Sequence, residues 1–104
     1  MNEITPQELK KLRDEKSDFV LIDVREDYEF EEANLGGKHI PMGEVMARMQ
    51  EIPRDKKVVV HCRSGKRSAS VIQALEKQGY TNLFNLRGGI LAWAEEIDPS
   101  LLDQ

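Results

Sequence analysis

The feature that most constrains this chain is the run of residues 58–68, which changes from a strand pattern to a helix pattern around one thiol. Three consecutive valines predict a buried strand, because β-branched side chains pack well in a sheet. The strand leads to Cys62, the only cysteine in the chain. A glycine and three cations follow, and a helical pattern begins at Ser68. The run therefore predicts a strand, a tight loop and a helix N-terminus, with a thiol where they meet.

The predicted loop has the chemistry of an anion site. A helix N-terminus offers unpaired N–H groups and the positive end of a dipole, and a loop curled over it can direct several amides at one point. A thiol placed there ionises more readily than a free thiol, since the thiolate is stabilised. We therefore predict that Cys62 is an activated nucleophile. The residues predicted to bind its anionic substrate are Arg63, Ser64, Gly65, Lys66 and Arg67.

The alternative for Cys62 is an inert structural cysteine at a strand end, because cysteine is among the most buried residue types. A solvated cationic loop with a glycine is a poor place for an inert core thiol, so we favour the nucleophile.

The rest of the chain alternates strand and helix patterns with short connections. This order predicts an α/β fold in which helices cover both faces of a mainly parallel sheet. No repeat or internal linker interrupts it, so we expect a single domain over residues 1–104. The expected strands and extended segments are 19–24, 38–41, 57–61 and 82–86, and the expected helices are 5–15, 26–33, 43–52, 68–78 and 90–94.

Two charged residues, Asp23 and Arg25, follow the apolar part of the first expected strand. The carboxyl ends of strands are where open α/β sheets place their sites, which makes the two residues candidate supporting groups. We favour a structural interpretation, in which they form ion pairs or cap the next helix. The acidic stretch at residues 26–32 is most simply a solvated helix face.

Composition excludes several classes of function. A net charge of −4 argues against a general nucleic-acid binder, whereas three cations without an acid at residues 61–75 suggest a small anionic ligand. No apolar run is long enough for a transmembrane helix, and no secretory signal pattern is present at the N-terminus. One cysteine and two histidines do not provide a standard zinc cluster. We expect a cytoplasmic protein without metal, cofactor, membrane or nucleic-acid partner.

The single thiol also limits the reaction. Without a second cysteine, an adduct on Cys62 must be removed by an outside acceptor, which favours group transfer over redox cycling within the chain. His61 precedes the cysteine and invites a cysteine–histidine dyad. Because adjacent strand residues point to opposite faces, we expect its ring to point away from the thiol and not to act as a base.

The motif Cys62-Arg63-Ser64-Gly65-Lys66-Arg67 resembles the C-R-x-G-x-R active-site loop of rhodanese-family sulfurtransferases. The resemblance covers nearly the whole chain. Its further motifs are Leu21-Ile22-Asp23-Val24-Arg25-Glu26 with Glu29-Phe30, His39-Ile40-Pro41, Gly79-Tyr80 and Leu86-Arg87-Gly88-Gly89-Ile90-Leu91-Ala92-Trp93.

This resemblance implies a three-layer rhodanese-like fold with a central five-stranded parallel sheet flanked by helices. It implies that Cys62 carries a sulfane sulfur as a persulfide, taken from a small anionic donor such as thiosulfate. The acceptor would be cyanide, a thiol or a sulfur-carrier protein. Residues 34–41 resemble rhodanese modules fused to ubiquitin-like-activating enzymes, which keeps the protein acceptor open.

Two rival functions remain. Phosphatase relatives of this fold use a Cys-x5-Arg loop, whereas Cys62 and Arg67 give Cys-x4-Arg, a smaller loop that suits sulfur better than phosphate. A non-catalytic binding module is the other rival. Inactive members of the family typically lack the cysteine, whereas this chain retains it together with every cation of the loop.

Overall fold

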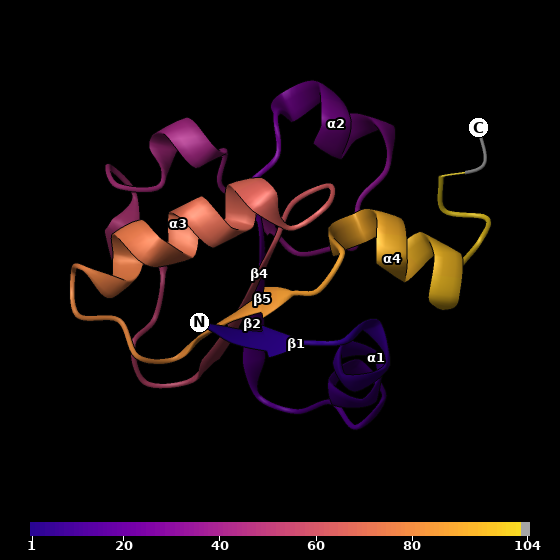
Figure 1. Cartoon of the computed structure of the whole chain (residues 1–104), viewed down its shortest axis with the longest axis horizontal. Coiled ribbons are helices and arrows are strands. Elements are labelled where there is room, and N and C mark those ends of the chain that lie inside the picture. Colours follow the sequence, from indigo (N-terminus) through magenta and orange to yellow (C-terminus); the bar gives the residue numbers. More distant parts are fainter. Residues whose placement is uncertain (103–104) are drawn as a thin grey trace.

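The computed structural model describes residues 1–102, and its centre is a five-stranded, fully parallel sheet in the order β1-β5-β4-β2-β3 (Figure 1). The α/β class is as predicted, and the five-stranded parallel sheet is as the family resemblance implies. The strands are β1 (Asn2–Ile4), β2 (Phe19–Asp23), β3 (Lys38–His39), β4 (Lys57–His61) and β5 (Leu83–Leu86). The helices are α1 (Pro6–Asp14), α2 (Asp27–Glu32), α3 (Lys66–Glu76) and α4 (Gly89–Glu96), with 3₁₀ turns η1 (Met42–Glu44) and η2 (Met49–Glu51).

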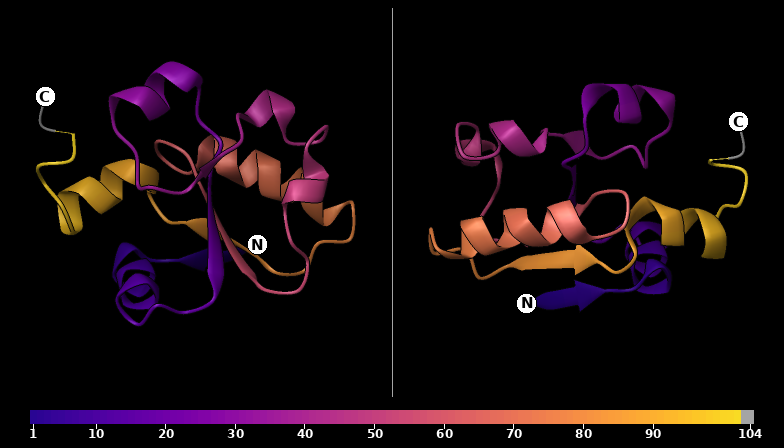
Figure 2. Two further views of the ribbon diagram at one scale, coloured as in Figure 1. Left: turned by 180° about the vertical axis from the view of Figure 1, so that it is seen from behind. Right: turned by 45° about the horizontal axis from the view of Figure 1, so that its top comes forward.

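The central strand β4 divides the core into two clusters, because alternate strand residues face opposite sides of the sheet. Val58, Val60 and Cys62 pack on one side with Ile72 and the rest of the α3 face. Val59 packs on the other side with residues of α1 and α4. In the left view of Figure 2, α1 and α4 lie on one side of β2, with α3 and the 3₁₀ turns on the other. The sheet is thus covered on both faces, as predicted.

Helix α1 begins where its sequence indicates. Thr5 accepts a hydrogen bond from the Glu8 amide, and the Glu8 carboxylate accepts one from the Thr5 amide, forming a capping box with Pro6 just inside the helix. Leu9 is fully buried. This end of the chain is scaffold, and none of the described helices is long and apolar enough to cross a membrane.

The residue pattern did not indicate the first strand, β1. It pairs with β5 at the sheet edge, with Ile4 opposite Leu86. Ile4 is the only apolar residue of the three and the only buried one. The sequence therefore has no alternation of apolar and polar residues that would indicate a strand. Tertiary pairing, and not local preference, forms this strand.

The helix predicted for residues 43–52 is wrong. The segment forms the separate turns η1 and η2, and the backbone of Arg48 between them leaves the helical region. Val45 and Ile52 are buried, but Met46 is 47% exposed, so the methionines do not form one continuous core face. Gly43 also lowers the helix propensity of the segment.

Candidate active site

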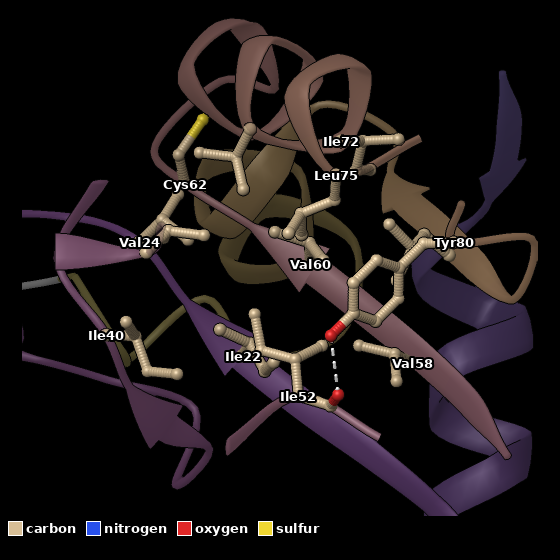
Figure 3. Packing of buried hydrophobic residues seen from close by; sticks show 13 residues of the cluster. Ile22, Val24, Ile40, Ile52, Val58, Val60, Cys62, Ile72, Leu75 and Tyr80 are labelled. Carbon is tan, nitrogen blue, oxygen red and sulfur yellow. Dashed lines mark hydrogen bonds between the residues drawn. The ribbon is translucent and has the colours of Figure 1, made fainter. Parts of the chain in front are cut away.

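The candidate site lies at the carboxyl end of β4, where the chain turns into α3. Cys62 follows the strand directly and is only 1% exposed. Figure 3 shows it at one end of the core cluster, with its sulfur directed toward the loop and helix that follow; at the other end, the Tyr80 hydroxyl donates to the Ile52 carbonyl at 2.8 Å. Arg63, Ser64 and Lys66 are exposed. The thiol therefore lies beneath a solvated loop.

The sulfur of Cys62 is surrounded by hydrogen-bond donors. The Gly65 amide donates to it at 3.1 Å and the Ser68 amide at 3.4 Å, while the Ser68 hydroxyl lies 3.4 Å away. Gly65 occupies the N-cap position of α3, where it has no side chain to offer. The cysteine sulfur therefore accepts the hydrogen bond of the Ser68 amide, at the third helical position, that a capping side chain normally accepts.

Two opposing effects act on the pKa of Cys62. Burial by itself raises the pKa, because it disfavours the charged thiolate. The hydrogen bonds that the Ser68 hydroxyl and the loop amides can donate to the thiolate together lower the pKa by more, so it lies below that of an ordinary cysteine. An inert core thiol would be surrounded by apolar atoms alone, so this environment favours the nucleophile.

The shape of the loop depends on two glycines. Gly65 has φ +107°, a backbone conformation that residues with a side chain rarely adopt. Gly89, at the start of α4, lies so close to the loop that a Cβ would come within 2.4 Å of the Arg63 carbonyl oxygen. This approach lets the Ile90 amide donate to the Cys62 carbonyl at 2.9 Å and the Leu91 amide to the Arg63 carbonyl at 3.1 Å. The N-termini of α3 and α4 thus hold the loop from two sides.

Arg67, predicted to bind the anionic substrate, forms an ion pair within the protein. Its guanidinium donates to both carboxylate oxygens of Glu29, at 2.7 and 3.0 Å. This hydrogen bonding lowers the pKa of Glu29 to about 2. The interpretation of residues 26–32 as simply a solvated face is therefore wrong for Glu29, whose side chain is 12% exposed and ties α2 to the loop. Arg63 and Lys66 remain the exposed cations of the loop.

Asp23 and Arg25 form a buried ion pair with each other, as the structural interpretation predicted. The Arg25 guanidinium donates to Asp23 at 2.8 Å and to the Ala33 carbonyl at 2.7 Å. The pair therefore fixes the connection between β2 and the end of α2. Arg25 also lines a pocket of about 300 Å³ together with Arg63 and Leu91, beside the cysteine loop.

His61 is fully buried on the other face of the sheet from Cys62, since it follows the alternation that begins at Val59. Its Nδ1 lies 3.4 Å from the Cys62 carbonyl oxygen and its Nε2 lies 3.7 Å from the Asp23 carboxylate. Burial lowers the pKa of His61 to about 4, so the ring is neutral at pH 7. The geometry agrees with the expectation that His61 is not the base of a dyad.

Sequence reasoning missed two buried polar residues behind the sulfur, Ser68 and Asn85. The Ser68 hydroxyl donates to the Asn85 carbonyl oxygen at 2.6 Å, and the Asn85 amide donates to the Gly65 carbonyl at 3.1 Å. Ser68 could have been noticed as a polar residue in the first turn of the helix. Asn85 lies on β5 and offers no local signal. Within residues 1–102, no group of three His, Cys, Asp or Glu side chains could hold a metal ion.

Comparison with known proteins shows the family to which the chain belongs. The sequence matches the family described as the rhodanese-like domain over residues 5–96. A protein named "Sulfurtransferase" from Allochromatium vinosum is 40% identical over 95 residues, which cover 90% of this chain and 89% of that protein. "Adenylyltransferase and sulfurtransferase MOCS3-2" of Zea mays is 33% identical over 104 residues, which cover 92% of this chain but 22% of that protein.

A solved structure extends the likeness to three dimensions. The crystal structure of a rhodanese-like domain protein from Staphylococcus aureus superposes with a TM-score of 0.85 at 32% identity, covering 93% of this chain and 95% of that one. Because the family match spans most of the sequence and the solved relative shares the fold over nearly its whole length, this chain belongs to the rhodanese-like domain family.

Proposed function

We propose that this protein is a sulfurtransferase that carries a sulfane sulfur as a persulfide on Cys62. The observation that supports this most is the sulfur itself, held by amides of the loop and of α3 with its pKa lowered. A thiolate stabilised in this way needs no neighbouring base. The names of relatives that match over nearly their whole length support the same class of reaction.

The proposed reaction has two halves. The Cys62 thiolate first attacks the outer sulfur of a donor such as thiosulfate; a bond forms between Sγ and that sulfur, and the donor leaves as sulfite with the electron pair of the broken bond. A thiophilic acceptor, cyanide or a thiolate, then attacks the outer sulfur of the persulfide. The bond to Sγ breaks, its electron pair returns to Sγ, and the thiolate is restored.

The loop favours these steps through charge. The exposed cations Arg63 and Lys66 attract an anionic donor and stabilise negative charge that develops beside the sulfur. Arg67 contributes mainly by holding the loop to α2 through Glu29. The acceptor is cyanide, a thiol or a sulfur-carrier protein. The chemistry requires a free thiol, so we place the reaction in a reducing compartment such as the cytoplasm.

Mass spectrometry of the intact protein tests the proposal. After incubation with thiosulfate, the wild-type protein should gain the mass of one sulfur atom, and cyanide should remove it with release of thiocyanate. Cys62→Ser should gain none. A wild-type protein that takes no sulfur from thiosulfate or from a persulfide donor would overturn the proposal in favour of a non-catalytic binding module.

A phosphatase assay addresses the other rival. The Cys-x4-Arg spacing predicts no turnover of an aryl phosphate, because the loop is one residue short of the spacing used for phosphoryl groups. Turnover that disappears in Cys62→Ser would overturn the sulfur assignment.

A further inference from the structure

Behind the Cys62 sulfur lies a short chain of hydrogen bonds through Ser68 and Asn85, to which the two proposed half-reactions assign no role. Ser68 is fully buried and Asn85 is 5% exposed. The Ser68 Oγ lies 3.4 Å from the Cys62 sulfur on one side and 2.6 Å from the Asn85 carbonyl oxygen on the other. The hydroxyl thus stands between the reacting atom and an amide that belongs to another strand.

The Ser68 hydroxyl has a single proton, so it can donate strongly to only one of its two neighbours. In the arrangement described, it donates to Asn85 and presents a lone pair to the sulfur. That arrangement suits an uncharged sulfur. A thiolate can only accept hydrogen bonds, so rotation of the hydroxyl about its Cβ–Oγ bond would turn the proton toward it. Asn85 keeps its place, since its amide also holds the Gly65 carbonyl.

We propose that Ser68 is a further catalytic residue, whose hydroxyl donates its hydrogen bond to the Cys62 sulfur when that sulfur is charged and to Asn85 when it is not. Asn85 is its positioning residue, and its carbonyl oxygen accepts the hydrogen bond of the hydroxyl whenever the sulfur is uncharged. This inference rests on the proposed sulfur transfer and assigns the hydroxyl to both halves. When the persulfide forms, Sγ loses its charge and the proton turns to Asn85. When the acceptor breaks the bond between the two sulfurs, the electron pair returns to Sγ and the proton turns to the sulfur.

The other charged and titratable groups around the sulfur are left in place by a change at Ser68. Arg63 and Lys66 are exposed on the loop. Arg67 is held by Glu29. His61 is buried on the opposite face of the sheet. Removal of the Ser68 hydroxyl therefore changes the hydrogen-bond chain of Ser68 and Asn85 and leaves these charged and titratable groups as they are.

The first experiment compares Ser68→Ala with the control Ser70→Ala. Ser70→Ala is the same substitution on the same helix, but Ser70 is exposed. Among the described residues, the Ser70 hydroxyl donates only to the Lys66 carbonyl, at 3.4 Å. The readout is the rate of Cys62 alkylation by iodoacetamide from pH 5 to pH 11. Loss of a hydrogen bond to a thiolate should slow alkylation about tenfold at pH 6 and leave the plateau at high pH unchanged. Ser70→Ala should follow the wild type. A Ser68→Ala profile that superimposes on the wild-type profile would overturn the inference.

A second variant separates the hydroxyl from packing. Ser68→Thr keeps the hydroxyl and should restore alkylation at pH 6, whereas an equal loss in both variants would show that packing, and not the proton, is responsible. Single-turnover transfer of sulfur from the loaded protein to cyanide should also be slower in Ser68→Ala. Alkylation does not require a sulfur donor. A wild type that never loads sulfur would therefore refute the proposed function and leave the alkylation result standing, whereas normal transfer with unchanged alkylation would refute the role of Ser68 alone.

Discussion

Replacement of Glu29 by glutamine should destabilise the protein, because it breaks the paired hydrogen bonds that tie α2 to the cysteine loop. The pKa of Glu29 falls from 4.5 to about 2 in the folded protein. That shift corresponds to an upper limit of roughly 3 kcal/mol at neutral pH. Because a third of the Arg67 side chain is exposed, solvent screening reduces the expected loss to about 1–2 kcal/mol.

The effect should depend on pH in a defined direction. A carboxylate with a lowered pKa stabilises the fold above its unfolded pKa, and this contribution disappears as the pH falls through the folded pKa. The wild type should therefore exceed Glu29→Gln in stability by a constant amount above about pH 5, and by progressively less toward pH 2.

Urea unfolding at pH 7, 4 and 2.5, followed by tryptophan fluorescence, measures this difference. Glu31→Gln is the matched control, because it removes the same charge from an exposed position of the same helix. Equal unfolding free energies for the two variants at pH 7, or a difference that persists unchanged at pH 2.5, would refute the assigned role of the ion pair.

Three further predictions concern the scaffold of the site. Gly89→Ala should lower the free energy of unfolding, measured with urea, by about 2 kcal/mol or more, as in an overpacked core, because its Cβ would lie 2.4 Å from the loop backbone. Gly43→Ala, whose Cβ would meet nothing within 4 Å, should leave the free energy of unfolding nearly unchanged. Asp23→Asn should lower the unfolding free energy by about 3 kcal/mol, since it leaves the buried Arg25 without its counterion; a loss below 1 kcal/mol would contradict this. His61 has a pKa lowered to about 4, so its imidazole should stay neutral at pH 5.5 in an NMR titration, and stability should fall as the pH drops from about 6.5 toward 4; a midpoint near 6.5 would refute its burial as the cause.

The parts of the site that are local in sequence could be predicted from it. The valines of β4, the thiol and the glycine loop are contiguous, and each residue favours its structure by its own chemistry. The ion pair of Asp23 and Arg25 also lies within three residues. These elements needed no knowledge of the rest of the fold.

The contacts that complete the site could not be predicted, because they join distant segments. Glu29 and Arg67 are 38 residues apart, and Asn85 reaches Gly65 across 20 residues. Charge alone indicated a solvated face for Glu29, since its partner belongs to another element. The segment at 43–52 has helical spacing, but its buried residues, Val45 and Ile52, each follow a short 3₁₀ turn and join the core cluster from there.

The hydrogen bonds from the start of α4 to the cysteine loop have a kinetic consequence. The Ile90 and Leu91 amides donate to loop carbonyls and hold the loop within the fold, so much of the conformational entropy of the loop is lost during folding. The donor meets a preorganised site, and its association rate should be set by diffusion and by the exposed charges of Arg63 and Lys66. Loading with thiosulfate should then slow steadily as ionic strength rises, while transfer to a neutral acceptor should change little.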